Sequence, residues 1–123
     1  MISTPWNIGN VSITGKLVLA PMTKITDLPF RLLCRSIGAN LAFTEMVNIN
    51  AVSRGNKAAL TNFLTCIEDR PLGIQLFGTQ PDKFQTTAQI IVETIQPTQG
   101  AFFDINLECP DPKVLSQGAG AAS

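Results

Sequence analysis

The sequence contains no histidine, and its three cysteines, Cys34, Cys66 and Cys109, lie far apart. Without histidine, the chain lacks the commonest metal ligand and the usual base that activates a nucleophile. An odd number of cysteines with no Cys-x-x-Cys pair matches neither a disulfide framework nor a zinc site. Chemistry in this chain must therefore depend on cysteine, lysine, carboxylates or a bound cofactor.

Net charge and long apolar segments are also lacking. Nine basic residues balance nine acidic ones, so composition gives no general electrostatic reason to bind nucleic acid or an anionic membrane. No apolar run approaches the roughly 20 residues that a membrane-spanning helix needs. Residues 1–6 have neither the charged nor the apolar region of a signal peptide. We expect one soluble, cytoplasmic domain with no membrane or metal partner.

What the chain does have is a regular alternation of short apolar runs and amphipathic segments. A hairpin is predicted over residues 6–16, where it would close one end of a larger sheet. Strands are predicted at 17–20, 41–45, 71–78 and 101–105, and helices at 26–37, 48–54, 57–64 and 79–96. Residues 66–70 are predicted to form a polar connection, which makes Cys66 a poor catalytic candidate.

Capping signals and apolar stripes define the two longer helices. Thr26 is the predicted N-cap of the first, and Thr79 with Asp82 resembles a capping box at the start of the second. The first helix is predicted to bury one apolar face, made of Phe30, Leu33, Cys34 and Ile37.

The spacing of the strands indicates the fold class. Their starts lie about 24, 30 and 30 residues apart, and strands that alternate with helices form a parallel sheet. A (β/α)8 barrel uses about 31 residues per unit. We therefore predict the N-terminal half of a TIM barrel, about four βα units with a leading hairpin. An open doubly wound domain is the rival, but its usual glycine-rich first turn is missing at residues 21–26.

Ligands of parallel α/β folds bind beyond the carboxyl ends of the strands. The side chains expected there are Pro21, Met22, Thr23, Thr44, Glu45, Gln75, Gly78, Asn106 and Cys109. Most are neutral hydrogen-bonding groups, which suit a flat heteroaromatic ring better than a metal or a bare phosphate.

Single residues in this set carry different weight. Gln75 is an amide in an apolar strand, so it either bonds neighbouring backbone or contacts a ligand, and we favour the ligand. Asn106 is better explained as a turn-forming residue on composition alone, whereas Glu45 is left undecided and Asp104 is read as structural. Cys109 stands beyond a strand end, where a thiol can act as a general acid.

Five segments together resemble one known family. They are Leu19–Met22 followed by Thr26–Arg31, then Thr44–Met46, Arg70–Gly78, and Asp104–Pro110 running into Lys113 and Gly118–Gly120. Ala-Pro-Met is common among flavin barrels, but Asp-Ile-Asn-x-x-Cys-Pro with a downstream lysine and Gly-Ala-Gly is specific. The chain is similar to the flavin-dependent tRNA-dihydrouridine synthases. Without this resemblance, Gly118–Gly120 is interpreted only as a flexible segment.

The resemblance implies an FMN-binding TIM barrel that NADPH reduces and that reduces a uracil flipped out of tRNA. Pro21, Met22 and Thr23 would line the flavin, and Gln75 would bond its polar edge. By the same resemblance, Asn106 would contact the target base and Cys109 would donate a proton to C5.

The chain also departs from the family. Glu108 stands where the family usually has glycine, and Lys24 replaces another usually small residue. Family segments that hold the FMN phosphate and grip tRNA have no counterpart in residues 1–123, which we therefore read as a partial FMN-binding barrel domain. We expect this polypeptide alone to bind FMN weakly and to be inactive. The alternatives are another FMN-dependent oxidoreductase acting on a small molecule, or a non-catalytic remnant that self-associates.

Overall fold

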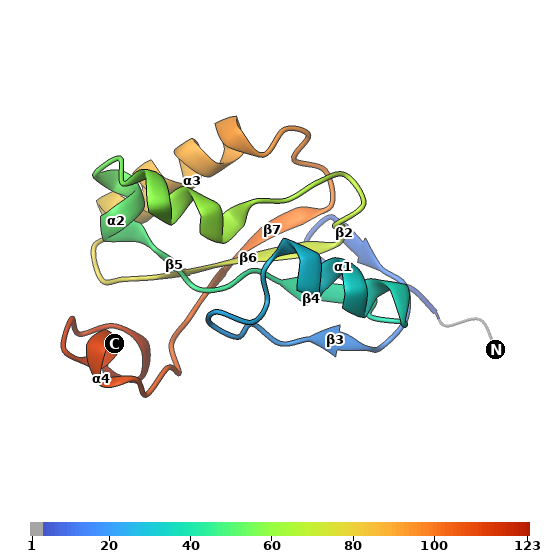
Figure 1. Cartoon of the computed structure of the whole chain (residues 1–123), viewed down its shortest axis with the longest axis horizontal. Helices are drawn as coiled ribbons and strands as arrows, with labels where there is room; N and C mark the ends of the chain where they lie inside the picture. The colour runs from blue at the N-terminus through green and yellow to red at the C-terminus, as the bar shows by residue number, and fades with distance from the viewer. Residues whose placement is uncertain (1–3) are drawn as a thin grey trace.

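Residues 4–123 are described by the structure, a computed structural model, and their backbone alternates strands with helices (Figure 1). The strands are β1 (Trp6–Ile8), β2 (Val11–Ile13), β3 (Val18–Leu19), β4 (Leu41–Phe43), β5 (Val47–Asn48), β6 (Leu72–Phe77) and β7 (Ala101–Ile105). The α-helices are α1 (Leu28–Ser36), α2 (Ile49–Ser53), α3 (Pro81–Thr94) and α4 (Pro112–Leu115), and the 3-10 helices are η1 (Lys57–Phe63) and η2 (Gly120–Ala122). Residues 1–3 of the segment examined for a signal peptide lie outside the described residues.

β6 is the centre of the larger sheet, and each of its partners runs parallel to it. β4 and β5 follow one another along one side of β6, β7 pairs along the other side, and β3 pairs with β4. The predicted parallel α/β architecture and its four strands are confirmed. β5 was not predicted, and the half-barrel assignment stays a prediction.

The two faces of β6 have different surroundings because side chains alternate along a strand. Leu72, Ile74 and Leu76 point to the helices and form the main core. Their partners in this core include Ile49, Val52, Phe63, Ile91 and Ile95 from α2, η1, α3 and its C-terminal end. Figure 1 shows α2, η1 and α3 on this side of the sheet. Gly73 and Gln75 therefore belong to the opposite face.

The predicted hairpin is confirmed as the antiparallel pair β1–β2. Trp6 Nε1 donates to the carbonyl of Gly15 at 2.7 Å, and Asn40 Oδ1 accepts the Leu17 amide at 3.0 Å, just before β4. The hairpin thus lies at the amino ends of the strands, opposite the end where parallel sheets bind ligands. No helix within residues 4–123 is both long and apolar enough to cross a membrane.

The predicted apolar face of α1 is wrong. Leu33 is 59% exposed and Ile37 is 77% exposed, whereas Arg31 is 1% exposed. The N-cap is also Asp27 rather than Thr26, because the Asp27 carboxylate accepts the Phe30 amide at 3.0 Å. The helix therefore turns an arginine inward, which periodicity of apolar residues does not anticipate.

The predicted capping box of α3 is also wrong. Its N-cap is Gln80, whose side chain makes no capping hydrogen bond, and Pro81 takes the first helical position. A proline there loses nothing, since the first amides of a helix have no internal partner. The apolar stripe predicted for this helix does contribute to the core, through Ile91 and Ile95.

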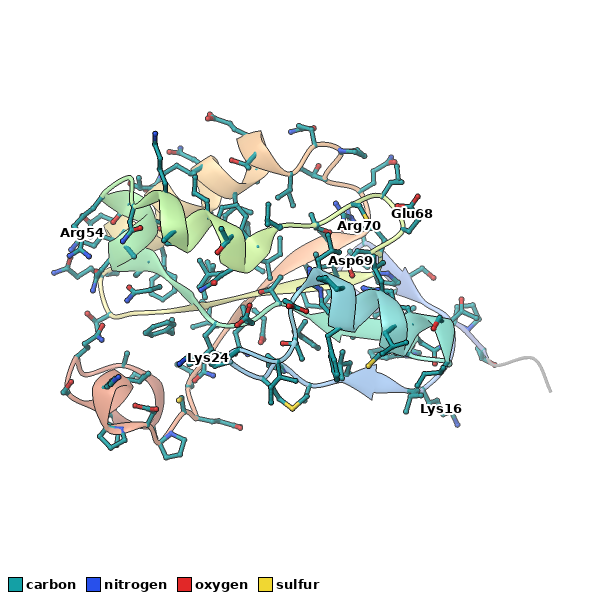
Figure 2. All side chains as sticks on the ribbon, viewed as in Figure 1. Lys16, Lys24, Arg54, Glu68, Asp69 and Arg70 are labelled. Carbon is teal, nitrogen blue, oxygen red and sulfur yellow. The ribbon has the colours of Figure 1, made fainter. Side chains whose placement is uncertain are left out.

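Asp69 explains the inward arginine. Its carboxylate is fully buried and accepts hydrogen bonds from Arg31 (2.8 and 3.1 Å), Arg35 (2.9 Å) and Thr65 (2.9 Å). The neighbouring Arg70 donates to the carbonyls of Pro97 and Gln99 just before β7. Figure 2 shows Asp69 and Arg70 between α1 and the start of β6. Within the segment predicted as a polar connection, the buried Asp69 and its neighbour Arg70 therefore join α1, β6 and β7.

Two opposing effects act on the Asp69 carboxyl. Burial raises its pKa, but hydrogen bonds from Arg31 and Thr65 and the charges of Arg31 and Arg35 outweigh burial, so the pKa of Asp69 lies below its ordinary value. A group with a lowered folded pKa stabilises the fold above its unfolded pKa, about 3.9 for aspartate. That contribution is lost as the pH falls through the folded pKa of Asp69, below about pH 4.

We predict that Asp69→Asn lowers the free energy of unfolding at pH 7 by about 3–5 kcal/mol, because Arg31 loses its buried counter-charge. Urea unfolding measures this difference. Asp82→Asn is the matched control, since Asp82 is exposed on α3, and it should change stability by no more than about 0.5 kcal/mol. The gap between wild type and Asp69→Asn should narrow as the pH falls below about 4. Equal losses in both variants would contradict the assignment.

Candidate functional site

A hollow of about 470 Å³ lies at the carboxyl ends of β3, β6 and β7. Its lining residues are Ala20, Pro21, Thr23, Met46, Gln75, Asn106, Glu108, Cys109 and Pro110. Thr44, Glu45 and Gly78 of the expected strand-end set do not line this hollow. Of the six residues to which the resemblance gives a role, the structure brings together all but one. The exception is Met22, which is 37% exposed and is not part of the lining.

The loop after β3 is held from within by Thr26. Its hydroxyl, fully buried, accepts the Met22 amide at 3.0 Å and donates to the Met22 carbonyl at 3.2 Å. The Thr26 carbonyl in turn accepts Arg31 Nη1 at 2.7 Å. Thr26 therefore fixes the backbone between Pro21 and Thr23 and connects it to the Asp69 junction.

Glu45 ties two strand-end loops together, which answers a question that the sequence left open. Its carboxylate accepts the backbone amide of Lys24, whose φ of 65° lies in the left-handed region. Few residues other than glycine adopt that region easily, so the bond to Glu45 holds Lys24 in a backbone conformation that is unfavourable for lysine. Figure 2 shows Lys24 at the tip of the loop after β3, on the side toward α4.

Gln75 is held by side chains, not by neighbouring backbone. Its Nε2 donates to Asp104 Oδ2 at 2.6 Å, and its Oε1 accepts Asn106 Nδ2 at 3.1 Å. The Gln75 backbone amide donates to Thr44 Oγ1 at 3.1 Å. The amide nitrogen keeps a second N–H, so contact with a ligand in the hollow stays available to it.

Asn106 forms the turn that delivers Cys109. Its Oδ1 accepts the backbone amides of Glu108 at 3.0 Å and Cys109 at 2.9 Å. Such a turn, in which a side-chain oxygen replaces a backbone acceptor, is typical of asparagine. The turn-forming interpretation is confirmed, and Asn106 Nδ2 keeps one N–H beyond its bond to Gln75.

Residues 118–120 are packed into the fold, so the interpretation of Gly118–Gly120 as a flexible segment is wrong. Ala119 is fully buried beside Phe77 and Val114, and the half-buried Cys109 packs against this cluster together with Met46. The Cys109 carbonyl accepts the Ala121 amide at 3.1 Å. Residues 119–121 therefore pack against the loop that carries Cys109.

Sequence reasoning gave no role to several residues of this site, among them Met46, Asp104 and Gly120. Met46 lines the hollow, Asp104 bonds to Gln75, and Gly120 lies against the Cys109 carbonyl. Strand alternation puts Asp104 on the same face as Asn106, and that signal was available in the sequence. Among residues 4–123, no three His, Cys, Asp or Glu side chains gather as metal ligands would.

A family model for dihydrouridine synthases matches residues 18–123. The chain belongs to the dihydrouridine synthase family. The match includes every residue that lines the hollow.

Individual relatives agree with this assignment. The chain is 39% identical over 116 residues to tRNA-dihydrouridine synthase B of Xanthomonas axonopodis pv. citri, a match that covers 94% of this chain and 33% of the relative. It is 36% identical over 105 residues to a probable tRNA-dihydrouridine synthase of Aquifex aeolicus, covering 85% of this chain and 32% of that protein. The chain therefore spans about a third of the length of the curated relatives it matches.

We predict that Gly120→Ala displaces the Cys109 loop. An added Cβ would lie 2.6 Å from the Cys109 carbonyl oxygen and 2.9 Å from Val114 Cγ1, at a φ of 59°. The strain and the clash together should lower the free energy of unfolding by about 2–4 kcal/mol. Urea unfolding and the rate of Cys109 alkylation measure the two effects.

Gly9→Ala is the matched control for this prediction. Gly9 has a φ of 57°, but an added Cβ would meet nothing within 4 Å. It should therefore show only the cost of the left-handed backbone, about 1–2 kcal/mol, and unchanged alkylation of Cys109. Similar behaviour of the two variants would show that Gly120 is needed only for its backbone conformation.

Proposed function

We propose that residues 1–123 form the N-terminal, FMN-binding half of the barrel domain of a tRNA-dihydrouridine synthase. The enzyme would reduce the C5=C6 bond of a uridine in tRNA, with NADPH as the source of electrons. The observation that carries this proposal is the convergence of Pro21, Thr23, Gln75, Asn106 and Cys109 on one hollow at the strand ends. The family assignment and the names of the relatives support it.

The hollow suits the ring system of FMN in size and chemistry. Its volume of about 470 Å³ falls within the range of small-molecule sites. Pro21, Met22 and Thr23 would hold the flat ring, and the second N–H of Gln75 would meet its polar edge. Apart from Glu108, which is exposed to solvent, the lining is uncharged, so a neutral heteroaromatic ring fits it without burying an unpaired charge.

Cys109 is the proton donor in this proposal. When bound and reduced, FMN supplies the hydride that is added to C6 of the uracil. The Cys109 thiol then gives its proton to C5, which completes the reduction and leaves a thiolate that regains a proton from water. Asn106 contacts the base through its second N–H while its carbonyl oxygen holds the backbone of Cys109. The uracil must leave the stacked tRNA to reach this site.

We propose that the 123 residues alone bind FMN weakly and do not turn over tRNA. The residues that line the hollow include neither lysine nor arginine. Nothing in that lining would therefore neutralise the phosphate of FMN, which other enzymes bind with cationic side chains or helix amides.

A flavin titration tests both the ring site and the weak phosphate binding. Lumiflavin has the ring of FMN without the phosphate, so both should bind with similar dissociation constants, roughly 0.1 mM or weaker. Gln75→Ala should weaken both by several-fold through loss of one hydrogen bond. Flavin fluorescence measures these constants, and Gln85→Ala on the exposed side of α3 is the control.

Alkylation of the cysteines locates the bound ring. Saturating lumiflavin should slow the reaction of Cys109 with iodoacetamide and leave Cys66, which is also half-buried, unaffected. Equal protection of both thiols, or no flavin binding at millimolar concentration, would overturn the proposed site. An FMN affinity more than about tenfold above that of lumiflavin would overturn the proposed weak phosphate binding.

We propose further that the half barrel self-associates through its open sheet edges. β3 and β7 each pair with only one strand among residues 4–123. Apolar side chains stand exposed at both edges: Leu17 and Val18 before and on β3, and Phe103, Ile105 and Leu107 on or after β7. An exposed strand edge flanked by apolar side chains tends to pair with another chain.

We predict that the purified chain sediments as a dimer or larger species at micromolar concentration. Ile105→Lys should shift the equilibrium toward monomer, because Ile105 is 54% exposed on the edge strand β7. Ile67→Lys is the control, since Ile67 is 66% exposed in the loop before β6, away from both edges. A monomeric wild type, or equal effects of the two lysines in sedimentation equilibrium, would contradict self-association through β7.

A further inference from the structure

Asp104 stands at the start of a directed row of hydrogen bonds. It pairs with Gln75 across β6 and β7, and its Oδ2 accepts Gln75 Nε2 at 2.6 Å. An ionised carboxylate can only accept hydrogen bonds. The nitrogen of the Gln75 amide must therefore face Asp104, and the oxygen must face away from it.

The rest of the row follows from that first orientation. Gln75 Oε1, which can only accept, takes Asn106 Nδ2 at 3.1 Å. Asn106 Oδ1 is then directed at the next loop, where it accepts the amides of Glu108 and Cys109. Backbone N–H groups can only donate, so the row has an acceptor at one end and donors at the other.

Turning over either side-chain amide breaks the hydrogen bonds on both sides of that amide. If Gln75 turned over, its oxygen would face the carboxylate of Asp104. If Asn106 turned over, its nitrogen would face the amides of Glu108 and Cys109. Like groups in contact leave polar atoms without partners, which costs about 1–3 kcal/mol for each buried group.

We propose that Asp104 is a positioning residue that sets the direction of both amides and, through them, holds the loop of Cys109. It acts through Gln75 and Asn106 and does not itself line the hollow of about 470 Å³. The consequence for proton donation rests on the function proposed above for Cys109. The consequence for the loop backbone depends only on the hydrogen bonds.

Hydrogen exchange of backbone amides in the 123-residue chain tests this role. Asp104→Leu removes the acceptor, so the amides of Glu108 and Cys109 should exchange about tenfold faster relative to the Ile91 amide in the core helix α3. Asp104→Asn keeps one acceptor oxygen at the same position. It should therefore restore exchange at Glu108 and Cys109 to within about threefold of wild type.

Asp82→Leu is the control, because Asp82 is exposed on α3 and should leave the Glu108 and Cys109 amides unchanged. Three results would each overturn the proposal: no acceleration in Asp104→Leu, equal acceleration at Ile91, or no rescue by Asp104→Asn. The last two would mean that Asp104 acts through general stability or through its charge. The exchange experiment needs no flavin, so failure of the flavin titration leaves its result intact.

Discussion

The buried carboxylate of Asp69 joins parts of the chain that lie far apart in sequence. Arg31 and Arg35 bring α1 to it, and Thr65 anchors the loop that precedes β6. Through Arg31 the same junction reaches the Thr26 carbonyl, and the Thr26 hydroxyl fixes the backbone of Met22. Two arginines on one buried carboxylate are stable only as a complete set, since any member left alone would be an unpaired buried charge. The site loop after β3 therefore depends on the ion pair between Asp69 and Arg31, which lies near the start of the helix that follows this loop.

The candidate site obeys a related constraint, in which each polar group determines what its neighbour can do. Asp104 can only accept and backbone amides can only donate, so the two side-chain amides between them have one consistent orientation. Behind this row, Gly120 lies against the Cys109 carbonyl because no side chain fits there. The backbone of Cys109 is thus held at its amide by Asn106 and at its carbonyl by Gly120 and Ala121.

Much of this could be predicted from local patterns, and the errors have a common origin. The strands of the parallel sheet and their carboxyl-end residues follow from short apolar runs, whose physics is local. The apolar face of α1 was wrong because Leu33 and Ile37 are exposed here while Arg31 is buried. The role of Gly118–Gly120 was missed because its partners, Thr79 and Cys109, lie on other segments. Burial of charge and close backbone approach depend on partners that periodicity does not reveal.

The sequence by itself determined the order of the four predicted strands and of the helices between them, the parallel α/β class, the family resemblance and the identity of the strand-end residues. Each of these depends on residue type and spacing along the chain. Only the tertiary structure decided which of them share a hollow, that Asp69 is a junction rather than a linker, and that Gln75 and Asn106 form one row with Asp104. Those facts depend on register. Pairing Gln75 with Asp104 across β6 and β7 is a choice of alignment between strands, and a shift of one residue would turn the amide away.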